Sequence, residues 1–211
     1  MKNVVYNEDC RETLQRIFKY HYVLTGFPDL SELGNIPPSE YKDFAYSVLS
    51  KLKPANNVIT IQSTDRKKGG IIIQKHLMFT EIMASLGWKL ISQKIWVKSY
   101  KINLFRLEYS FFLTFQKGKI PFLTKPMPDV YYVNKNLVYT KTAKGAFPKD
   151  IAVDFIRNYT RKGEMVYDPF MGSGVTAFVA LVTERGYCGS ELDKDIYGNF
   201  KIEEERRWGL K

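Results

Sequence analysis

A short glycine loop between an expected strand and an expected helix limits the folds open to this chain more than any other feature. The loop reads DPFMGSG over residues 168–174, after an apolar run at 165–167 and before a helical pattern at 176–183. Glycine lets the backbone turn sharply and approach a ligand closely, and the first turn of the following helix presents unpaired N–H groups. This order predicts an α/β fold with a ligand site at the carboxyl ends of its strands.

The rest of the chain supports this fold because short apolar segments alternate with helical patterns. Strands are expected at 4–6, 22–25, 57–62, 165–167 and 187–191, and helices at 8–18, 44–52, 73–86, 150–159 and 176–183. Two further apolar segments, 88–97 and 108–115, have no helix-length spacer between them and predict an antiparallel pair at one sheet edge. The sequence therefore predicts a single Rossmann-like domain over 1–211, with a mostly parallel sheet and a charged tail.

Composition and charge narrow the class of protein. The chain has 211 residues, 45% of them hydrophobic and 26% charged, which suits one folded domain. With 32 Lys and Arg against 22 Asp and Glu, the formal charge is +10. Such a surface attracts a polyanion such as nucleic acid, although a generally basic, solvated surface is an equal alternative.

Cysteine and histidine usage adds expectations about metal and location. Cys10, Cys188, His21 and His76 do not form a metal-type cluster, so no metal site is expected. The sequence has no run of roughly 18 apolar residues, the length that a membrane span needs. These features predict a cytoplasmic protein with reduced thiols and no membrane segment.

Acidic residues near the glycine loop indicate what it binds. Glu191 ends the next expected strand, roughly 20 residues after the loop, where related folds place a carboxylate that accepts hydrogen bonds from ribose hydroxyls. Asp168 is placed to face a cationic amine. A dinucleotide site is the nearest alternative, since Gly172, Gly174 and Ala177 fit the looser G-x-G-x-x-A pattern. The acidic Asp168 disfavours a pyrophosphate and favours an amino-acid head group.

Together with its neighbours, the glycine loop resembles a known family. DPFMGSG and the later GYCGSELDKDIY look like the cofactor motifs of DNA methyltransferases that modify the exocyclic amine of cytosine (N4) or adenine (N6). NEDCRETL, GAFPKDIAVDFI, LKPANNVITIQS, IWVKS and LEYSFFLTFQKGK also resemble parts of that family. The catalytic half precedes the cofactor half, as in the circularly permuted subgroup. The resemblance implies S-adenosyl-L-methionine as cofactor and methyl transfer to a DNA base amine, in a prokaryotic or viral restriction-modification context.

The resemblance also implies which residues hold the cofactor. Asp9 and Cys10 correspond to neighbours of its adenine, and Phe147 corresponds to a residue over its methionine end. Core packing is the alternative for Phe147 and for Cys10. The complete implied set is Asp9, Cys10, Phe147, Asp168, Pro169, Phe170, Gly172, Gly174 and Glu191.

The segment that should carry the chemistry departs from the family pattern. The family has Asp, Ser or Asn, then Pro-Pro and an aromatic residue, whereas this chain has Gly26, Phe27, Pro28 and Asp29. In the family, a side-chain oxygen and a backbone carbonyl accept both amine protons and free the nitrogen lone pair, while the aromatic ring stacks on a flipped base. Gly26 has no side-chain oxygen, and Asp29 has no ring.

Three hypotheses follow from this departure. In the first, the chain is an active methyltransferase in which Asp29 accepts one amine proton, the Phe27 carbonyl accepts the other and the Phe27 ring stacks on the base. In the second, it is a non-catalytic nucleic-acid-binding subunit of a heteromeric complex, although an intact cofactor loop argues against a pure scaffold. In the third, the acceptor differs and is RNA, a modified base or a free nucleotide.

Two basic segments are candidate nucleic-acid contacts. The first is a basic loop just past an expected strand end, with Arg66, Lys67 and Lys68. The second is a small candidate target-recognition insert at 118–144, where cations alternate with aromatic residues, among them Lys125, Tyr131 and Lys135. A solvated turn and an ordinary edge hairpin are the alternatives. The expected substrate is double-stranded DNA, and so short an insert also suggests a homodimer or a heteromeric partner.

Overall fold

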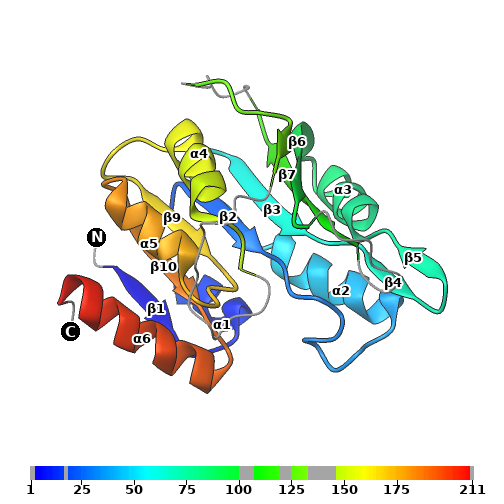
Figure 1. Cartoon of the computed structure of the whole chain (residues 1–211), viewed down its shortest axis with the longest axis horizontal. Helices are drawn as coiled ribbons and strands as arrows, with labels where there is room; N and C mark the ends of the chain where they lie inside the picture. The colour runs from blue at the N-terminus through cyan, green and yellow to red at the C-terminus, as the bar shows by residue number, and fades with distance from the viewer. Residues whose placement is uncertain (1–2, 17–18, 100–106, 119–124, 133–145, 210–211) are drawn as a thin grey trace.

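The computed structural model describes residues 3–16, 19–99, 107–118, 125–132 and 146–209 (Figure 1). Its centre is an eight-stranded sheet with the order β1-β10-β9-β2-β3-β7-β6-β8. The strands β1, β10, β9, β2 and β3 are parallel to one another, whereas β7 is antiparallel to both β3 and β6. The predicted α/β fold, mostly parallel with an antiparallel pair, is confirmed. The sheet strands are β1 (Val4–Tyr6), β2 (Tyr22–Gly26), β3 (Val58–Ser63), β6 (Lys89–Val97), β7 (Tyr109–Gln116), β8 (Val130–Tyr131), β9 (Met165–Asp168) and β10 (Gly186–Ser190).

Helices cover both faces of the sheet because successive residues of each strand point to opposite sides. On β2, Val23 belongs to a core cluster with α1, α2 and α3, while Tyr22 and Leu24 belong to a second cluster with α4, α5 and α6. Such strands are apolar on both faces, as parallel strands usually are. The helices are α1 (Cys10–Arg16), α2 (Pro38–Leu49), α3 (Lys75–Ser85), α4 (Lys149–Tyr159), α5 (Val175–Val182) and α6 (Lys194–Trp208).

The register of the parallel strands brings distant loops to one edge of the sheet. Gly26 at the end of β2 pairs with Gln62 of β3, and Gly189 of β10 pairs with Asp168 at the end of β9. The loops that follow β1, β2, β9 and β10 therefore lie at the same edge (Figure 1). This edge is where open α/β sheets bind ligands.

The prediction of a charged tail is wrong, because the structure has the helix α6 there. Asp193 caps its first turn by accepting hydrogen bonds from the N–H groups of Asp195 and Ile196, at 2.9 and 3.0 Å. Phe200 inserts from α6 into the second core cluster. The cap and this one buried ring hold a helix whose other residues are mostly polar, which is why its apolar periodicity is weak.

Other element boundaries also differ from the prediction. The expected basic loop at 66–68 is one arm of a hairpin, β4 (Arg66–Lys68) and β5 (Ile71–Ile73). Helix α2 begins at Pro38 instead of at 44, since proline is well tolerated at the first helical position. The antiparallel pair is not the edge itself, because β8, from the expected insert, pairs in parallel with β6. Within the described ranges, no helix has the length and hydropathy needed to cross a membrane.

Candidate functional site

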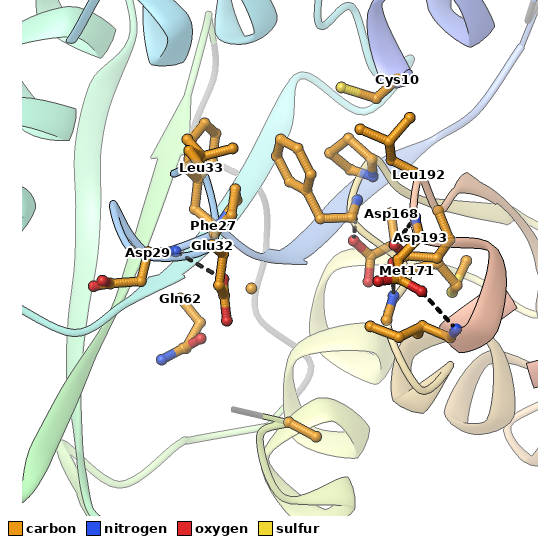
Figure 2. Close-up of a pocket in the computed structure, with 18 of the residues that line it drawn as sticks. Cys10, Phe27, Asp29, Glu32, Leu33, Gln62, Asp168, Met171, Leu192 and Asp193 are labelled. Atoms are coloured by element: carbon orange, nitrogen blue, oxygen red, sulfur yellow. Dashed lines mark hydrogen bonds between the residues drawn. The ribbon is translucent and has the colours of Figure 1, made fainter. Parts of the chain in front are cut away.

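The carboxyl ends of the parallel strands surround a cavity of about 870 Å³ (Figure 2). Its wall comes from the segments after β1, β2, β9 and β10 and from the residues just before α4. Gly174 is not part of this lining. Apart from Gly174, the fold brings the expected cofactor residues and the expected catalytic loop into one pocket. The residues of the sequence prediction that line it are Asp9, Cys10, Gly26, Phe27, Pro28, Asp29, Phe147, Asp168, Pro169, Phe170, Gly172 and Glu191.

The glycine loop has the backbone shape that its sequence predicts. Gly172 and Gly174 have φ values of 54° and 83°, in the left-handed region that favours glycine. Gly174 is the N-cap of α5, and a Cβ atom there would lie 2.3 Å from the Phe200 ring. The Met171 N–H donates to the Ser190 carbonyl at 2.8 Å, which ties the loop to β10. The N-terminus of α5 is thereby held next to the pocket.

Asp168 is the buried acid of the pocket. The hydroxyls of Thr25 and Thr176 each donate to its carboxylate at 2.7 Å, and the Phe170 N–H donates at 3.0 Å. Burial nevertheless raises the pKa of Asp168 to about 7, because these neutral donors only partly replace water. The group therefore changes charge near neutral pH, which suits a site whose ligand brings a positive charge.

Glu191 links the end of β10 to the glycine loop. Its Oε2 accepts a hydrogen bond from the Gly172 N–H at 2.8 Å, and its Oε1 accepts one from the Asp193 N–H at 2.9 Å. Burial raises the pKa of this carboxyl above its usual value. The side chain lines the pocket with both oxygens bound to backbone amides, a position from which it can also receive ligand hydroxyls.

The segment after β1, the strand next to β10, contributes Asp9 and Cys10 to the pocket. Asp9 pairs with Arg11 at 2.6 Å, and hydrogen bonding by that guanidinium lowers the pKa of Asp9. Burial raises the pKa of Cys10 to about 12, so its thiol is not a nucleophile at neutral pH. Cys10 also belongs to the first core cluster, so packing accounts for it.

The Phe27 ring is part of an aromatic cluster at the edge of the pocket. It is 6% exposed and lies 4.8 Å from the rings of both Phe79 and Phe170, centroid to centroid. The next residue, Pro28, is held by its carbonyl, which accepts the Tyr41 hydroxyl at 2.8 Å. This packing fixes the loop after β2 and leaves little of the Phe27 ring open for a base.

The Asp29 carboxylate is held by two cations. Lys75 Nζ lies 2.7 Å from Asp29 Oδ2, and Arg66 and Ser31 bind Oδ1. Burial alone would raise the pKa of Asp29, but Lys75 and Ser31 hold it well below its usual range. Burial also lowers the pKa of Lys75, whose side chain is only 2% exposed, and Asp29 opposes that effect. In Figure 2 the Asp29 carboxylate points away from the Asp168 end of the pocket.

Several pocket residues have no sequence signal of their own. Thr25 and Thr176 hold Asp168, Lys75 holds Asp29, and Gln62 and Glu32 line the pocket beside the loop after β2. Gln62 is within reach only because β3 pairs with β2 in parallel register. The local sequence does not encode this pairing, and it therefore gives no sign that Gln62 belongs to the site.

The candidate nucleic-acid residues are spread over two places. Lys67 and Lys68 are exposed on the β4–β5 hairpin, whereas the Arg66 guanidinium turns back to Asp29. Lys125 is exposed, and its N–H donates to Asn158. The Tyr131 hydroxyl donates to Asp154 of α4 at 3.1 Å, so this ring is held against the helix. Lys135, like 119–124 and 133–145 of the expected insert, lies outside the described residues.

Comparison with known proteins identifies relatives. The model of the N6/N4 DNA methylase family matches residues 31–201, beginning just after the divergent loop. Over 177 residues (65% of this chain), the sequence is 26% identical to the type II methyltransferase M.MjaI of Methanocaldococcus jannaschii and covers 57% of that protein. The chain spans about half the length of this relative and of a second curated relative, and less of a third.

Solved structures share the fold. The PvuII DNA methyltransferase, which is cytosine-N4-specific, has a TM-score of 0.79 and 18% identity, with 96% of this chain and 86% of that chain covered. TTHA0409 of Thermus thermophilus, solved in complex with S-adenosyl-L-methionine, has a TM-score of 0.76 and 20% identity, with 97% and 94% covered. At sequence identities of 18% and 20%, these comparisons show a shared fold and do not by themselves show a shared function. Since the family model covers most of the sequence, the chain belongs to the N6/N4 DNA methylase family.

Proposed function

We propose that the chain transfers a methyl group from S-adenosyl-L-methionine to the exocyclic amine of cytosine or adenine in DNA. The observation that carries this proposal is the single pocket in which the acid-flanked glycine loop meets the loop after β2. Membership of the DNA methylase family supports the reaction, and the complex of TTHA0409 supports the cofactor.

The residues of the pocket fit this cofactor. Asp168 offers a carboxylate to the ammonium group, Glu191 offers oxygens to ribose hydroxyls, and Asp9 lies on the wall expected to face adenine. Phe147 and Phe170 add apolar surface, and a cavity of about 870 Å³ is of the size that small-molecule sites have. When bound, the cofactor supplies an electrophilic methyl group on a sulfonium.

The loop after β2 is placed to hold the target amine. With the cofactor bound, the amine nitrogen would bond to the methyl carbon, the carbon–sulfur bonding pair would stay on sulfur, and one amine proton would pass to water. Acceptors for the two amine protons draw the nitrogen lone pair out of conjugation. The Pro28 carbonyl is taken by Tyr41, but the Phe27 carbonyl accepts no hydrogen bond from the part of the chain that the structure describes. The Phe27 carbonyl can therefore accept one of these protons.

The charge of the chain favours a nucleic-acid substrate, and membership of the DNA methylase family favours double-stranded DNA. The net charge is +10, and the exposed Lys67, Lys68 and Lys125 offer phosphate contacts. RNA presents the same phosphate charge, so the substrate assay includes both nucleic acids.

A binding and transfer assay tests the function. We expect the purified chain to bind S-adenosyl-L-methionine in a calorimeter and to move a tritiated methyl group onto unmethylated genomic DNA. Digestion to nucleosides then shows whether the label is on N4-methylcytosine or N6-methyladenine. Label on RNA alone would contradict the proposed substrate. Cofactor binding without transfer to either nucleic acid would favour the non-catalytic subunit.

The Asp29→Ala variant is expected to lose methyl transfer and stability while still binding the cofactor. Without Asp29, the buried Lys75 ammonium loses its partner, and breaking such a pair costs about 3 kcal/mol. Urea unfolding, calorimetric titration and the tritium assay measure the three quantities. A variant with wild-type stability and full activity would remove Asp29 from the mechanism.

A double variant, Asp29→Ala with Lys75→Met, separates two roles for Asp29. If Asp29 only positions the loop, removal of both charges restores stability and much of the transfer. If its carboxylate accepts the amine proton, stability returns and transfer does not.

A further inference from the structure

The neighbouring strand supplies an oxygen at the place where the loop after β2 lacks one. Gly26 ends β2 and pairs with Gln62 of β3 in parallel register. A Cβ atom built on Gly26 would lie 3.1 Å from Gln62 Oε1 and 3.8 Å from the Phe147 ring. The Gln62 carboxamide therefore lies in the space into which a side chain at position 26 would extend.

Gln62 is a nearly buried residue whose side-chain amide has no hydrogen-bond partner among the residues that the structure describes. The residue is 7% exposed and lines the pocket. Its backbone carbonyl accepts the Phe27 N–H at 3.0 Å, which fixes it beside the loop, but its side-chain amide makes no hydrogen bond with any residue in the described ranges. Most buried polar groups have a partner, so one that lacks it in a pocket indicates a ligand contact.

We propose that Gln62 is a catalytic residue whose Oε1 accepts one proton of the target amine, in place of the side chain that Gly26 lacks. With the Phe27 carbonyl as the second acceptor, both amine protons are bound. The carboxamide Nε2 donates to the adjacent ring nitrogen, N3 of cytosine or N1 of adenine, so the group matches both bases. This assignment rests on the proposed methyl transfer.

The two nearby carboxylates, Asp29 and Glu32, are less suited to this role. Both Asp29 oxygens are bound, to Lys75, Arg66 and Ser31. Glu32 is exposed, and its Oε2 accepts the Asp29 N–H at 2.8 Å. Figure 2 shows Gln62 on the same side of the pocket as Asp29 and Glu32, with Asp168 on the other side. An acceptor at Gln62 thus lies beside the loop after β2, across the pocket from Asp168.

The Gln62→Met variant tests the assignment through two opposite effects. Methionine has a similar shape without the acceptor oxygen, so we expect methyl transfer to fall about 100-fold or more. Because the unpartnered amide is replaced by an apolar group, we expect the unfolding temperature to rise by about 2–4 °C. Calorimetric binding of S-adenosyl-L-methionine should stay at the wild-type value. Gln93→Met, on the exposed face of β6, is the matched control and should change none of these quantities.

An exchange of the acceptor between the two strands gives a second test. Gln62→Ala clears the space beside Gly26, and adding Gly26→Asn to it should raise transfer at least about tenfold above Gln62→Ala alone. Wild-type transfer by Gln62→Met, a lowered unfolding temperature in that variant, or a double variant no faster than Gln62→Ala would each overturn the assignment. If the wild-type chain itself binds cofactor but methylates no DNA, the proposed function fails, and the assignment fails with it.

Discussion

Replacing Asp168 with asparagine is expected to weaken binding of S-adenosyl-L-methionine about 100-fold at pH 8 and about tenfold at pH 6. At pH 8 the wild-type carboxyl, whose pKa is about 7, is charged, and in the proposed complex it pairs with the cofactor ammonium. Loss of such a contact costs about 3 kcal/mol, which is about 100-fold. At pH 6 about nine tenths of the wild-type carboxyls are protonated before binding, which weakens the wild type itself about tenfold.

Calorimetric titration at pH 6, 7 and 8 measures this difference. In buffers of different ionisation enthalpy, the wild type should release a proton on binding at pH 6, and Asp168→Asn should release none. Thr25 and Thr176 can still hydrogen-bond the asparagine amide, so the variant should fold. A wild-type affinity that does not change with pH would show that Asp168 does not pair with the ammonium.

The same group affects stability with the opposite dependence on pH. Its folded pKa of about 7 lies above the value of an unfolded aspartate, so the folded chain binds more protons between roughly pH 4 and 7. The contribution of Asp168 to the free energy of unfolding is complete below about pH 4 and is lost as pH rises through 7. Cofactor-free chain with Asp168→Asn should lack this slope.

Gly189→Ala is expected to destabilise the chain by about 3 kcal/mol, which lowers its unfolding temperature by about 6–12 °C. A Cβ atom at Gly189 would lie 2.4 Å from the Asp168 carbonyl oxygen and 2.4 Å from Met171 Cε. The methionine can move, but the backbone carbonyl is part of β9 and cannot move without shifting Asp168 and the glycine loop. Cofactor affinity should therefore fall together with stability.

Gly198→Ala is the control for this substitution. A Cβ atom at Gly198 would have no neighbour within 4 Å, and the residue is inside α6. The same change of residue should therefore stabilise the chain by roughly 0.5–1 kcal/mol through helix propensity. Calorimetric unfolding of both variants gives the comparison, and a Gly189→Ala chain as stable as the wild type would contradict the close packing of β9 and β10.

Local patterns predict the elements whose signal is carried by their own residues. The parallel strands read as apolar runs because both faces are covered, and the glycine loop reads as a loop because Gly172 and Gly174 adopt positive φ. Helix α6 was not predicted, because it is stabilised by an N-cap at Asp193 and by the burial of Phe200. Neither feature produces a periodic apolar stripe in the sequence.

The site was predictable only in part, for a related reason. The sequence motifs name residues that do gather in one pocket, but the partners of those residues come from other segments. Lys75 reaches Asp29 across 46 positions, and Gln62 reaches Gly26 through strand pairing. Such contacts depend on register and packing, which a single segment of sequence does not contain.

The position of β1 has a consequence for the order in which the pocket is built during synthesis. β1 is the outermost strand and pairs with β10, and the side chain of Asn7 donates to the Glu191 carbonyl 184 positions later. On the ribosome, β1 must wait for β10 to emerge before it finds its neighbour, and contacts of such long sequence separation form slowly. Asp9 and Glu191 therefore cannot come together before β10 has been synthesised. A cofactor that touches both binds only chains that have completed this step, and stabilises those chains alone.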